Sequence, residues 1–246
     1  MTTVSGNDKA TRVQAMFARI APRYDLMNAL MTGGRDRAWR RVAARLGAPP
    51  AGSLALDLAT GTGDLALALL RETRVRGVVG VDFVEGMLHL GQTKLRARGE
   101  RRIRLLAGDA LALPFADGSF GCVASAFLLR NLADLRAGLA EMRRVTAPGG
   151  SVVALEITQP TLLGWRQVFR LYFHRVVPAV GALIAGNRDA YTYLPQSVDR
   201  FVTPPELVRL MEAVGLHDVR VRRVGLGTVT IHVGRVERRT RARVAA

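Results

Sequence analysis

Two aspartates bracket a glycine-rich segment whose residue types could bind a small cationic ligand. The segment is DLATGTGD, residues 57–64, and it lies between an apolar run and a stretch with helical character. Glycines at positions 61 and 63 let the backbone turn sharply and come close to a ligand. The candidate ligand-binding residues of this segment are Asp57, Thr60, Gly61, Thr62 and Gly63.

The charges around these glycines discriminate between two classes of ligand. With Ala66, the glycines also fit the pattern of a dinucleotide-binding turn, which places a pyrophosphate beside the loop. Two carboxylates, Asp57 and Asp64, would repel a pyrophosphate. They suit a ligand that carries a sulfonium and an ammonium and no phosphate, and S-adenosylmethionine is such a ligand. The alternative is a glycine-rich turn that binds nothing.

Two further aspartates follow strand-like runs and could complete a nucleoside site. Asp82 ends the second run, about 20 residues after the glycines, where an acid usually accepts hydrogen bonds from ribose hydroxyls. Asp109 and Ala110 follow the third run, and the Asp109 carboxylate could accept the adenine amino group. The alternatives are an exposed strand-end aspartate at 82 and a turn or helix-cap residue at 109.

The elements that must position these residues alternate between short apolar runs and helical stretches from position 54 onwards. Such alternation predicts an α/β fold with a doubly wound, mostly parallel sheet, in which ligands bind at the carboxyl ends of the strands. We expect the last two strand-like runs to pair antiparallel to each other. The expected strands are 54–58, 77–81, 103–106, 122–127, 151–156, 219–224 and 229–236, and the expected helices are 64–71, 87–98, 134–145 and 204–214.

The segments outside this alternation predict a division of the chain into five parts. Residues 10–46 are helical by apolar spacing, with a stop at Pro22 and a turn at Gly33-Gly34 before a second helix from about Arg35. We expect an N-terminal helical cover (1–50), a cofactor-binding core (51–160), an apolar insert over the substrate (161–203), a helix and strands that complete the sheet (204–236), and a basic tail (237–246).

The net charge of +16 does not by itself indicate nucleic acid, because its source is compositional. Lys9 and Lys94 are the only lysines among 36 basic residues, and the arginines are scattered except in the tail. We therefore expect no nucleic-acid partner. The single cysteine, Cys122, fits a reducing, cytoplasmic setting, and neither a secretion signal nor a membrane-spanning run is expected.

Longer motifs resemble the ubiquinone/menaquinone-biosynthesis C-methyltransferase family, a branch of the class I methyltransferases, over nearly the whole chain. They are YDLMNALMT at 24–32 with Trp39, RVTAPGG at 144–150 with LEIT at 155–158, and, in support, LPF at 113–115, FLLRN at 127–131 and AGNRDAYTYLPQS at 185–197. The chain departs from the family's usual residues at four positions: Thr32, Asp36, Ala126 and Leu128. Asp36 stands where the family usually has histidine and so replaces a proton acceptor or cation with an anion.

The resemblance implies S-adenosylmethionine as the cofactor and methylation of a prenylated quinol at a ring carbon. It favours demethylmenaquinol over a benzoquinol as acceptor, and it requires no metal. The sites it suggests for catalysis are Arg130 and Asn131, which follow the fourth strand, and Tyr24 in the N-terminal cover. A guanidinium at position 130 could stabilise a phenolate or orient a water that takes the proton, whereas a structural ion pair is the alternative.

The apolar insert and the acceptor together suggest partners. Its apolar residues alternate with Arg166, Arg170 and Arg175, which suits a cover packed on the sheet, a channel for a prenyl tail or a helix resting on lipid. We expect a prenylated quinol substrate, transient contact at the inner face of the membrane and, as an open alternative, a homodimer. The rival functions are another small-molecule or lipid methyltransferase, a nucleic-acid methyltransferase and a catalytically silent cofactor-binding scaffold.

Overall fold

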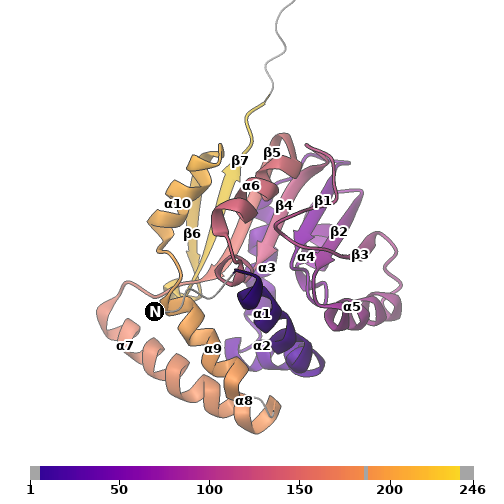
Figure 1. Ribbon diagram of the computed structural model, residues 1–246. Helices are drawn as coiled ribbons and strands as arrows, with labels where there is room; N and C mark the ends of the chain where they lie inside the picture. Colours follow the sequence, from indigo (N-terminus) through magenta and orange to yellow (C-terminus); the bar gives the residue numbers. More distant parts are fainter. Residues whose placement is uncertain (1–5, 186–187, 239–246) are drawn as a thin grey trace, which may run out of the picture.

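The computed structural model describes residues 6–185 and 188–238, and a seven-stranded sheet forms its centre (Figure 1). The strand order is β3-β2-β1-β4-β5-β7-β6. Strands β1 to β5 run parallel, whereas β7 is antiparallel to both of its neighbours, β5 and β6. The predicted doubly wound sheet with an antiparallel last strand is confirmed. The strands are β1 (Leu54–Leu58), β2 (Gly77–Asp82), β3 (Ile103–Ala107), β4 (Phe120–Ala126), β5 (Thr146–Ile157), β6 (His217–Val224) and β7 (Val229–Arg235).

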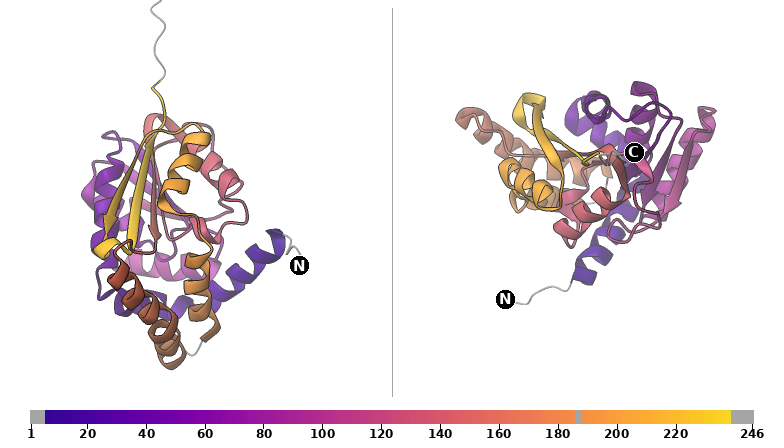
Figure 2. Two further views of the ribbon diagram at one scale, coloured as in Figure 1. Left: turned by 90° about the vertical axis from the view of Figure 1, so that its left-hand side faces the viewer. Right: turned by 90° about the horizontal axis from the view of Figure 1, so that it is seen from above.

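Helices cover both faces of the sheet because the central strands are apolar on both faces. In β1, Ala55 belongs to the core beneath α3, α4 and α5, while Leu56 and Leu58 belong to the core beneath α6 and α10. Successive side chains of a strand point to opposite faces, so one short run serves both cores. Figure 2 shows the two helical layers from above. The helices are α3 (Asp36–Gly47), α4 (Asp64–Glu72), α5 (Glu85–Ala97), α6 (Leu135–Val145) and α10 (Pro204–Ala213).

The N-terminal cover contains one helix more than the sequence predicted. After α1 (Gly6–Ile20), Pro22 occupies a single 3-10 turn (Ala21–Arg23), and the chain then continues directly into α2 (Tyr24–Thr32). Proline is compatible with the first turn of a helix, because the N–H it lacks has no partner there. Pro22 therefore redirects the chain rather than ending its helical character. Gly33 and Gly34 adopt left-handed φ values of 58° and 73°, which produce the predicted turn before α3.

The insert forms helices that pack on the N-terminal cover beyond the carboxyl ends of the parallel strands (Figure 1). They are α7 (Leu163–Leu171), a π-helical turn (Tyr172–Val176), α8 (Val177–Ala185) and α9 (Arg188–Asp199). One buried cluster joins the two segments, and it includes Met16 and Met27 from the cover with Phe173, Val177 and Tyr191 from the insert. The N-terminal cover and the insert, which both lie outside the alternating strand and helix pattern of the sequence, thus form a single roof.

Within residues 6–185 and 188–238, no helix is long and apolar enough to cross a bilayer. The division of the chain into five parts stays a prediction, and residues 239–246 of the expected basic tail lie outside the described residues.

Gly150→Ala should lower the free energy of unfolding by roughly 1–3 kcal/mol, the usual cost of overpacking a core. A Cβ at this buried position in β5 would lie 2.8 Å from the Ala147 carbonyl oxygen and 2.9 Å from that of Gly121, and backbone cannot move aside. Urea denaturation measures the change. The matched control is Gly86→Ala in α5, where a Cβ meets nothing within 4 Å. Equal stability of the two variants would contradict the prediction.

Candidate active site

The glycine-rich turn lies between the end of β1 and the start of α4, at the carboxyl edge of the sheet. Gly61 and Gly63 have φ values of 55° and 87°, in the left-handed region that glycine adopts without strain. The Thr60 amide donates to the carbonyl of Val81 at 3.0 Å, which ties the turn to β2. The turn is therefore a fixed backbone cradle that leads into a helix N-terminus.

Asp57 has a buried carboxylate in which only one of the two oxygens accepts hydrogen bonds from the described residues. Its Oδ2 accepts hydrogen bonds from the Thr60 hydroxyl at 2.7 Å and the Ala66 amide at 2.8 Å. Its Oδ1 is buried and has no hydrogen-bond partner among the described residues. Burial raises the pKa of Asp57 to about 7. A cation next to Oδ1 would supply the missing partner and favour the charged carboxylate. Asp57 therefore fits the ammonium of S-adenosylmethionine.

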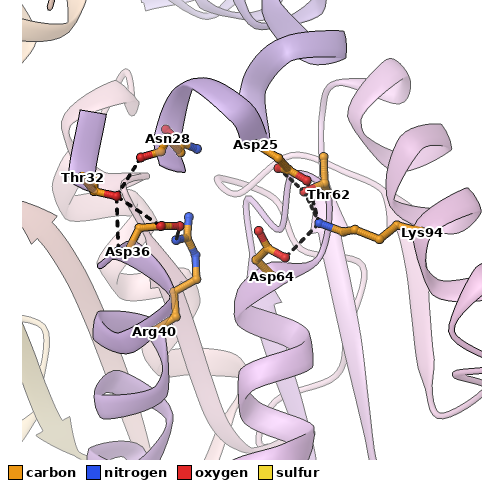
Figure 3. A network of polar contacts seen from close by, with 8 residues as sticks. All are labelled: Asp25, Asn28, Thr32, Asp36, Arg40, Thr62, Asp64 and Lys94. Atoms are coloured by element: carbon orange, nitrogen blue, oxygen red, sulfur yellow. Dashed lines mark hydrogen bonds and ion pairs between the residues drawn. The ribbon is translucent and has the colours of Figure 1, made fainter. Parts of the chain in front are cut away.

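Asp64, the second carboxylate of the turn, forms an ion pair with Lys94. No role for this lysine was evident from the sequence. The Lys94 ammonium in α5 donates to Asp64 at 2.9 Å, to Asp25 at 2.8 Å and to the Thr62 hydroxyl at 2.7 Å (Figure 3). Burial acts to raise the pKa of Asp64, but Lys94 outweighs it and the pKa is lowered. Asp64 also lines the small cavity that contains Asp57, so its contact with the ligand stays a prediction.

Asp82 organises the same turn from the end of β2. Its Oδ2 accepts from the Gly61 amide at 2.7 Å, and its Oδ1 accepts from the Val84 amide at 2.9 Å. Burial raises its pKa. Each carboxylate oxygen can accept a second hydrogen bond, so capacity for ribose hydroxyls remains, and Asp82 faces a small cavity beside Gly61 and Met87. Its role in ribose binding stays a prediction.

Asp109 and Ala110 lie apart from the residues just described. Asp109 is exposed, its Oδ1 accepts from the Leu111 amide at 2.9 Å, and its backbone pairs with Ala112 in an isolated bridge. Neither residue lines the small cavities around Asp57 and Asp82. Asp109 is thus a turn residue in the structure. Contact of Asp109 and Ala110 with adenine stays a prediction.

A larger cavity of about 130 Å³ lies under the roof, on the other side of Tyr24 from the glycine turn. One water needs only about 10–15 Å³ of such volume, so the cavity has room for part of an organic molecule. Tyr24 lines this cavity and both smaller ones, and its ring would be 3.8 Å from a Cβ at Gly61. The insert contributes five aromatic side chains to the walls: Phe169, Tyr172, Phe173, Tyr191 and Tyr193.

Arg130 and Asn131 line the cavity from the turn after β4. The Arg130 guanidinium pairs with Glu156 at 2.9 Å, and the two side chains are 6% and 1% exposed. Its Nε is buried and has no hydrogen-bond partner among the described residues. Asn131 accepts a hydrogen bond from the Tyr193 hydroxyl at 3.1 Å, which connects the sheet edge to the roof. A structural ion pair is present, and it leaves the Arg130 Nε free for a ligand.

All four departures from the family pattern line these cavities, and Ala126 lines both of the small ones. Thr32 and Asp36 line the large cavity, and Leu128 lines the small one beside Asp82. Leu128 therefore borders the nucleoside side rather than narrowing the acceptor cavity. Within the described part of the chain, no group of three or more His, Cys, Asp or Glu residues could hold a metal ion.

The glycine turn after β1, the aspartate at the end of β2 and the seven-stranded sheet with an antiparallel β7 define a class I S-adenosylmethionine-dependent methyltransferase. Within that class, the chain belongs to the ubiE/COQ5 methyltransferase family, whose sequence profile matches residues 4–236.

Relatives of known name cover almost the whole chain. The demethylmenaquinone methyltransferase of Thermus thermophilus is 48% identical over 219 residues, which are 89% of this chain and 99% of that protein. The protein of the same name from Deinococcus radiodurans is 47% identical over 227 residues, which are 92% of this chain and 93% of that protein.

Solved structures agree on the fold. A methyltransferase of Thermotoga maritima, described as a possible histamine N-methyltransferase, superposes with a TM-score of 0.65 at 18% identity, over 90% of this chain and 98% of that one. The cyclase SpnF superposes with a TM-score of 0.68 at 15% identity, over 92% and 95%. Because a cyclase and a methyltransferase share the fold, the site and not the fold must decide the reaction.

The affinity for S-adenosylmethionine should rise as the pH increases from about 6 to about 8, because Asp57 loses its proton in this range and then attracts the cation. In the cofactor-free protein, the stability that Asp57 contributes changes with pH in the opposite direction. A folded-state pKa of about 7, above the ordinary 3.8, gives stability that is present at low pH and lost as the pH rises through 7. Calorimetric titration across this range measures the affinity.

Asp57→Asn is the control for this pH dependence, because it keeps the shape of the side chain and cannot titrate. We expect it to bind more weakly and to lose the rise in affinity. A wild-type affinity that is constant over the range, or an unchanged slope in Asp57→Asn, would exclude Asp57 as the cation's partner.

Proposed function

We propose that the protein transfers the methyl group of S-adenosylmethionine to a ring carbon of demethylmenaquinol. The observation that carries the proposal is the position of Tyr24, which separates a donor turn with an unpartnered carboxylate oxygen from a cavity walled by aromatic rings. Flat aromatic walls suit a naphthoquinol ring. The names of the relatives support this acceptor over a benzoquinol.

On the donor side, Asp57 binds the ammonium, Asp82 accepts hydrogen bonds from the ribose, and Asp109 with Ala110 borders the adenine. The glycine turn keeps the backbone close to the ligand. When bound, S-adenosylmethionine supplies a methyl group on a positively charged sulfur that leaves as a neutral thioether. Placing the acceptor carbon in line with this group is the main task of the cavity walls.

On the acceptor side, Arg130 and Asn131 orient the quinol and stabilise negative charge on its oxygen. Arg130 is suited to this because its Nε has no other partner and its charge is held in place by Glu156. Donors that are already oriented towards developing charge cost no reorganisation when the charge forms. Tyr24 borders both the donor turn and the acceptor cavity, and it excludes water from the space around the two reactants.

The outer face of the roof fits the surface of an anionic bilayer, which is where a long-tailed quinol resides. Its apolar side chains are exposed on α7, the π-helical turn and α8, including Leu163 at 67%, Leu171 at 65% and Leu183 at 87%. Arg166, Arg170 and Arg175 are exposed among them, and no acidic residue occurs between positions 161 and 185. Phe169 and Phe173 of the same segment line the cavity. The prenyl tail of the acceptor can therefore pass from the cavity along this segment into the membrane.

The aromatic side chains of α7 are less suited to enter lipid than its aliphatic ones. Trp165 is half-buried, and Phe169 stacks on Phe173 with ring centroids 5.0 Å apart. The aliphatic residues have the outward positions. We propose a protein that resides in the cytoplasm and attaches reversibly to the membrane from that side.

Mass analysis of quinones from cells that lack the protein tests the proposed function. The proposal requires accumulation of the demethylated naphthoquinone, with the methylated form restored by the wild-type gene. Normal quinones in those cells would reject it in favour of another small-molecule methyltransferase. A protein that binds S-adenosylmethionine and turns over no quinol would be a scaffold.

The double variant Arg130→Met with Glu156→Gln should lower kcat by about 100- to 1000-fold, as expected for loss of an oxyanion-stabilising donor. Removing both charges avoids a buried unpaired carboxylate, which would destabilise the fold by itself. Steady-state kinetics and calorimetry measure turnover and cofactor affinity, and we expect the affinity to change little. The control is Glu156→Gln alone, which keeps Arg130. Turnover near the wild-type level in the double variant would contradict the role of Arg130.

Leu163→Ser with Leu171→Ser should weaken binding to phosphatidylglycerol vesicles by at least about tenfold, since each buried leucine contributes roughly 1.5–3 kcal/mol. Wild-type protein should sediment with these vesicles at low salt and detach at high salt, because the arginines contribute through screened charge.

The matched control removes exposed apolar residues from the two edge strands of the sheet, by Leu106→Ser with Val221→Ser. We expect it to bind like wild type. Equal loss in both double variants, or no vesicle binding by wild type, would contradict a membrane-facing roof. A concentration-dependent dimer that disappears in Leu163→Ser with Leu171→Ser would assign this face to a second copy of the chain.

A further inference from the structure

A buried ion pair on α3 forms part of the wall between the large cavity and the donor turn (Figure 3). Asp36, the first residue of α3, pairs with Arg40 one turn later at 2.5 Å, and each side chain is 6% exposed. Asp36 lines the acceptor cavity, whereas Arg40 lines the small cavity that contains Asp57. The pair therefore faces both reactants.

The hydrogen bonds around Asp36 leave one carboxylate oxygen without a firm donor. Its Oδ2 accepts from Arg40. Its Oδ1 lies 3.2 Å from the Thr32 hydroxyl, but that hydroxyl also lies 2.7 Å from the Asn28 carbonyl oxygen. A hydroxyl has one proton to donate, and the shorter contact is the stronger bond. The proton of Thr32 thus belongs to Asn28, and Oδ1 can accept a hydrogen bond from a ligand.

Asp36 is also the one carboxylate among the residues that line this cavity, and no histidine lines it. Burial raises the pKa of Tyr24, and it raises that of Tyr191 to about 12, so both keep their protons at neutral pH. Arg130 is a cation paired with Glu156. The titratable and charged groups that share the cavity with Asp36 are Tyr24, Arg130, Tyr172, Tyr191 and Tyr193, with Arg40 behind it.

Arg40 is suited to hold the Asp36 carboxylate in a fixed orientation. Its guanidinium carbon also lies 5.4 Å from the centre of the Phe127 ring, at the end of β4. Contacts with a carboxylate and an aromatic face fix the guanidinium on two sides. The ion pair thus offsets part of the cost of burying this carboxylate next to the acceptor.

We propose that Asp36 is the base that accepts the hydroxyl proton of the acceptor ring, and that Arg40 positions it. The inference rests on the proposed function, because it needs a ring hydroxyl in the cavity. The hydroxyl proton moves to Oδ1 of Asp36 as the ring carbon forms its bond to the methyl group. The bond from sulfur to that methyl breaks, and its electron pair remains on sulfur. Asp36 returns its proton to the oxygen when the methylated carbon loses its own proton to water, so one proton is released overall.

Asp36→Asn tests the proposal, because an amide keeps the acceptor for Arg40 and cannot take a proton. We expect kcat to fall by about 100- to 10,000-fold, the usual contribution of a general base. Affinity for S-adenosylmethionine should stay within about twofold. The rate of the variant should rise continuously with pH, as the quinol ionises without help, whereas the wild-type rate should reach a plateau above its acid limb.

Two companion variants separate a base from a structural residue. Asp36→Glu keeps a carboxylate, so it should retain the acid limb and recover part of the rate. Asp199→Asn removes a roof carboxylate that pairs with His174 outside the cavity, and it should behave like wild type. Near-normal kcat in Asp36→Asn, or the wild-type pH profile at a reduced rate, would overturn the proposal. Failure of the wild-type protein to methylate demethylmenaquinol would instead reject the proposed function.

Discussion

The unpartnered oxygen of Asp57 is the constraint on which the donor side of the site depends. One oxygen of this carboxylate holds the glycine turn against the start of α4, and the other is buried without a donor in the described structure. Leaving a charged oxygen in this condition is unfavourable, and a cationic ligand removes the penalty. The same residue therefore shapes the turn and presents a charge that suits a cation better than a phosphate.

The acceptor side depends on a roof that two lysines attach to the sheet. Lys94 joins α2 to the glycine turn through three oxygens, and Lys9 of α1 donates to the carbonyl of Leu132 at 2.6 Å, close to Arg130. The three donors of the Lys94 ammonium thus connect α2, the glycine turn and the start of α4 at a single point. The apolar walls that the roof adds give the cavity a low dielectric constant, in which charges interact more strongly than in water.

The sequence was sufficient for the features that depend on local pattern. The strand at 54–58, the antiparallel last pair and the placement of Asp57 and Asp82 at strand ends follow from periodicity and glycine spacing. The helix after Pro22 was missed because proline can begin a helix as well as end one. Lys94 and Tyr193 were missed because their partners are distant in the chain, and only the folded structure brings them together. The outward aliphatic face of the roof was likewise hidden, since burial decided which of its apolar residues face the cavity.

A single-turnover reaction with S-adenosylmethionine carrying a ¹³C-labelled methyl group tests the central claim most directly. Purified protein, demethylmenaquinol and labelled cofactor are mixed in detergent, and NMR of the extracted quinone locates the label. We predict one labelled methyl on the ring carbon next to an oxygen-bearing carbon, formed in proportion to enzyme. A label on a quinol oxygen, or an unlabelled quinone with the cofactor bound and intact, would contradict it.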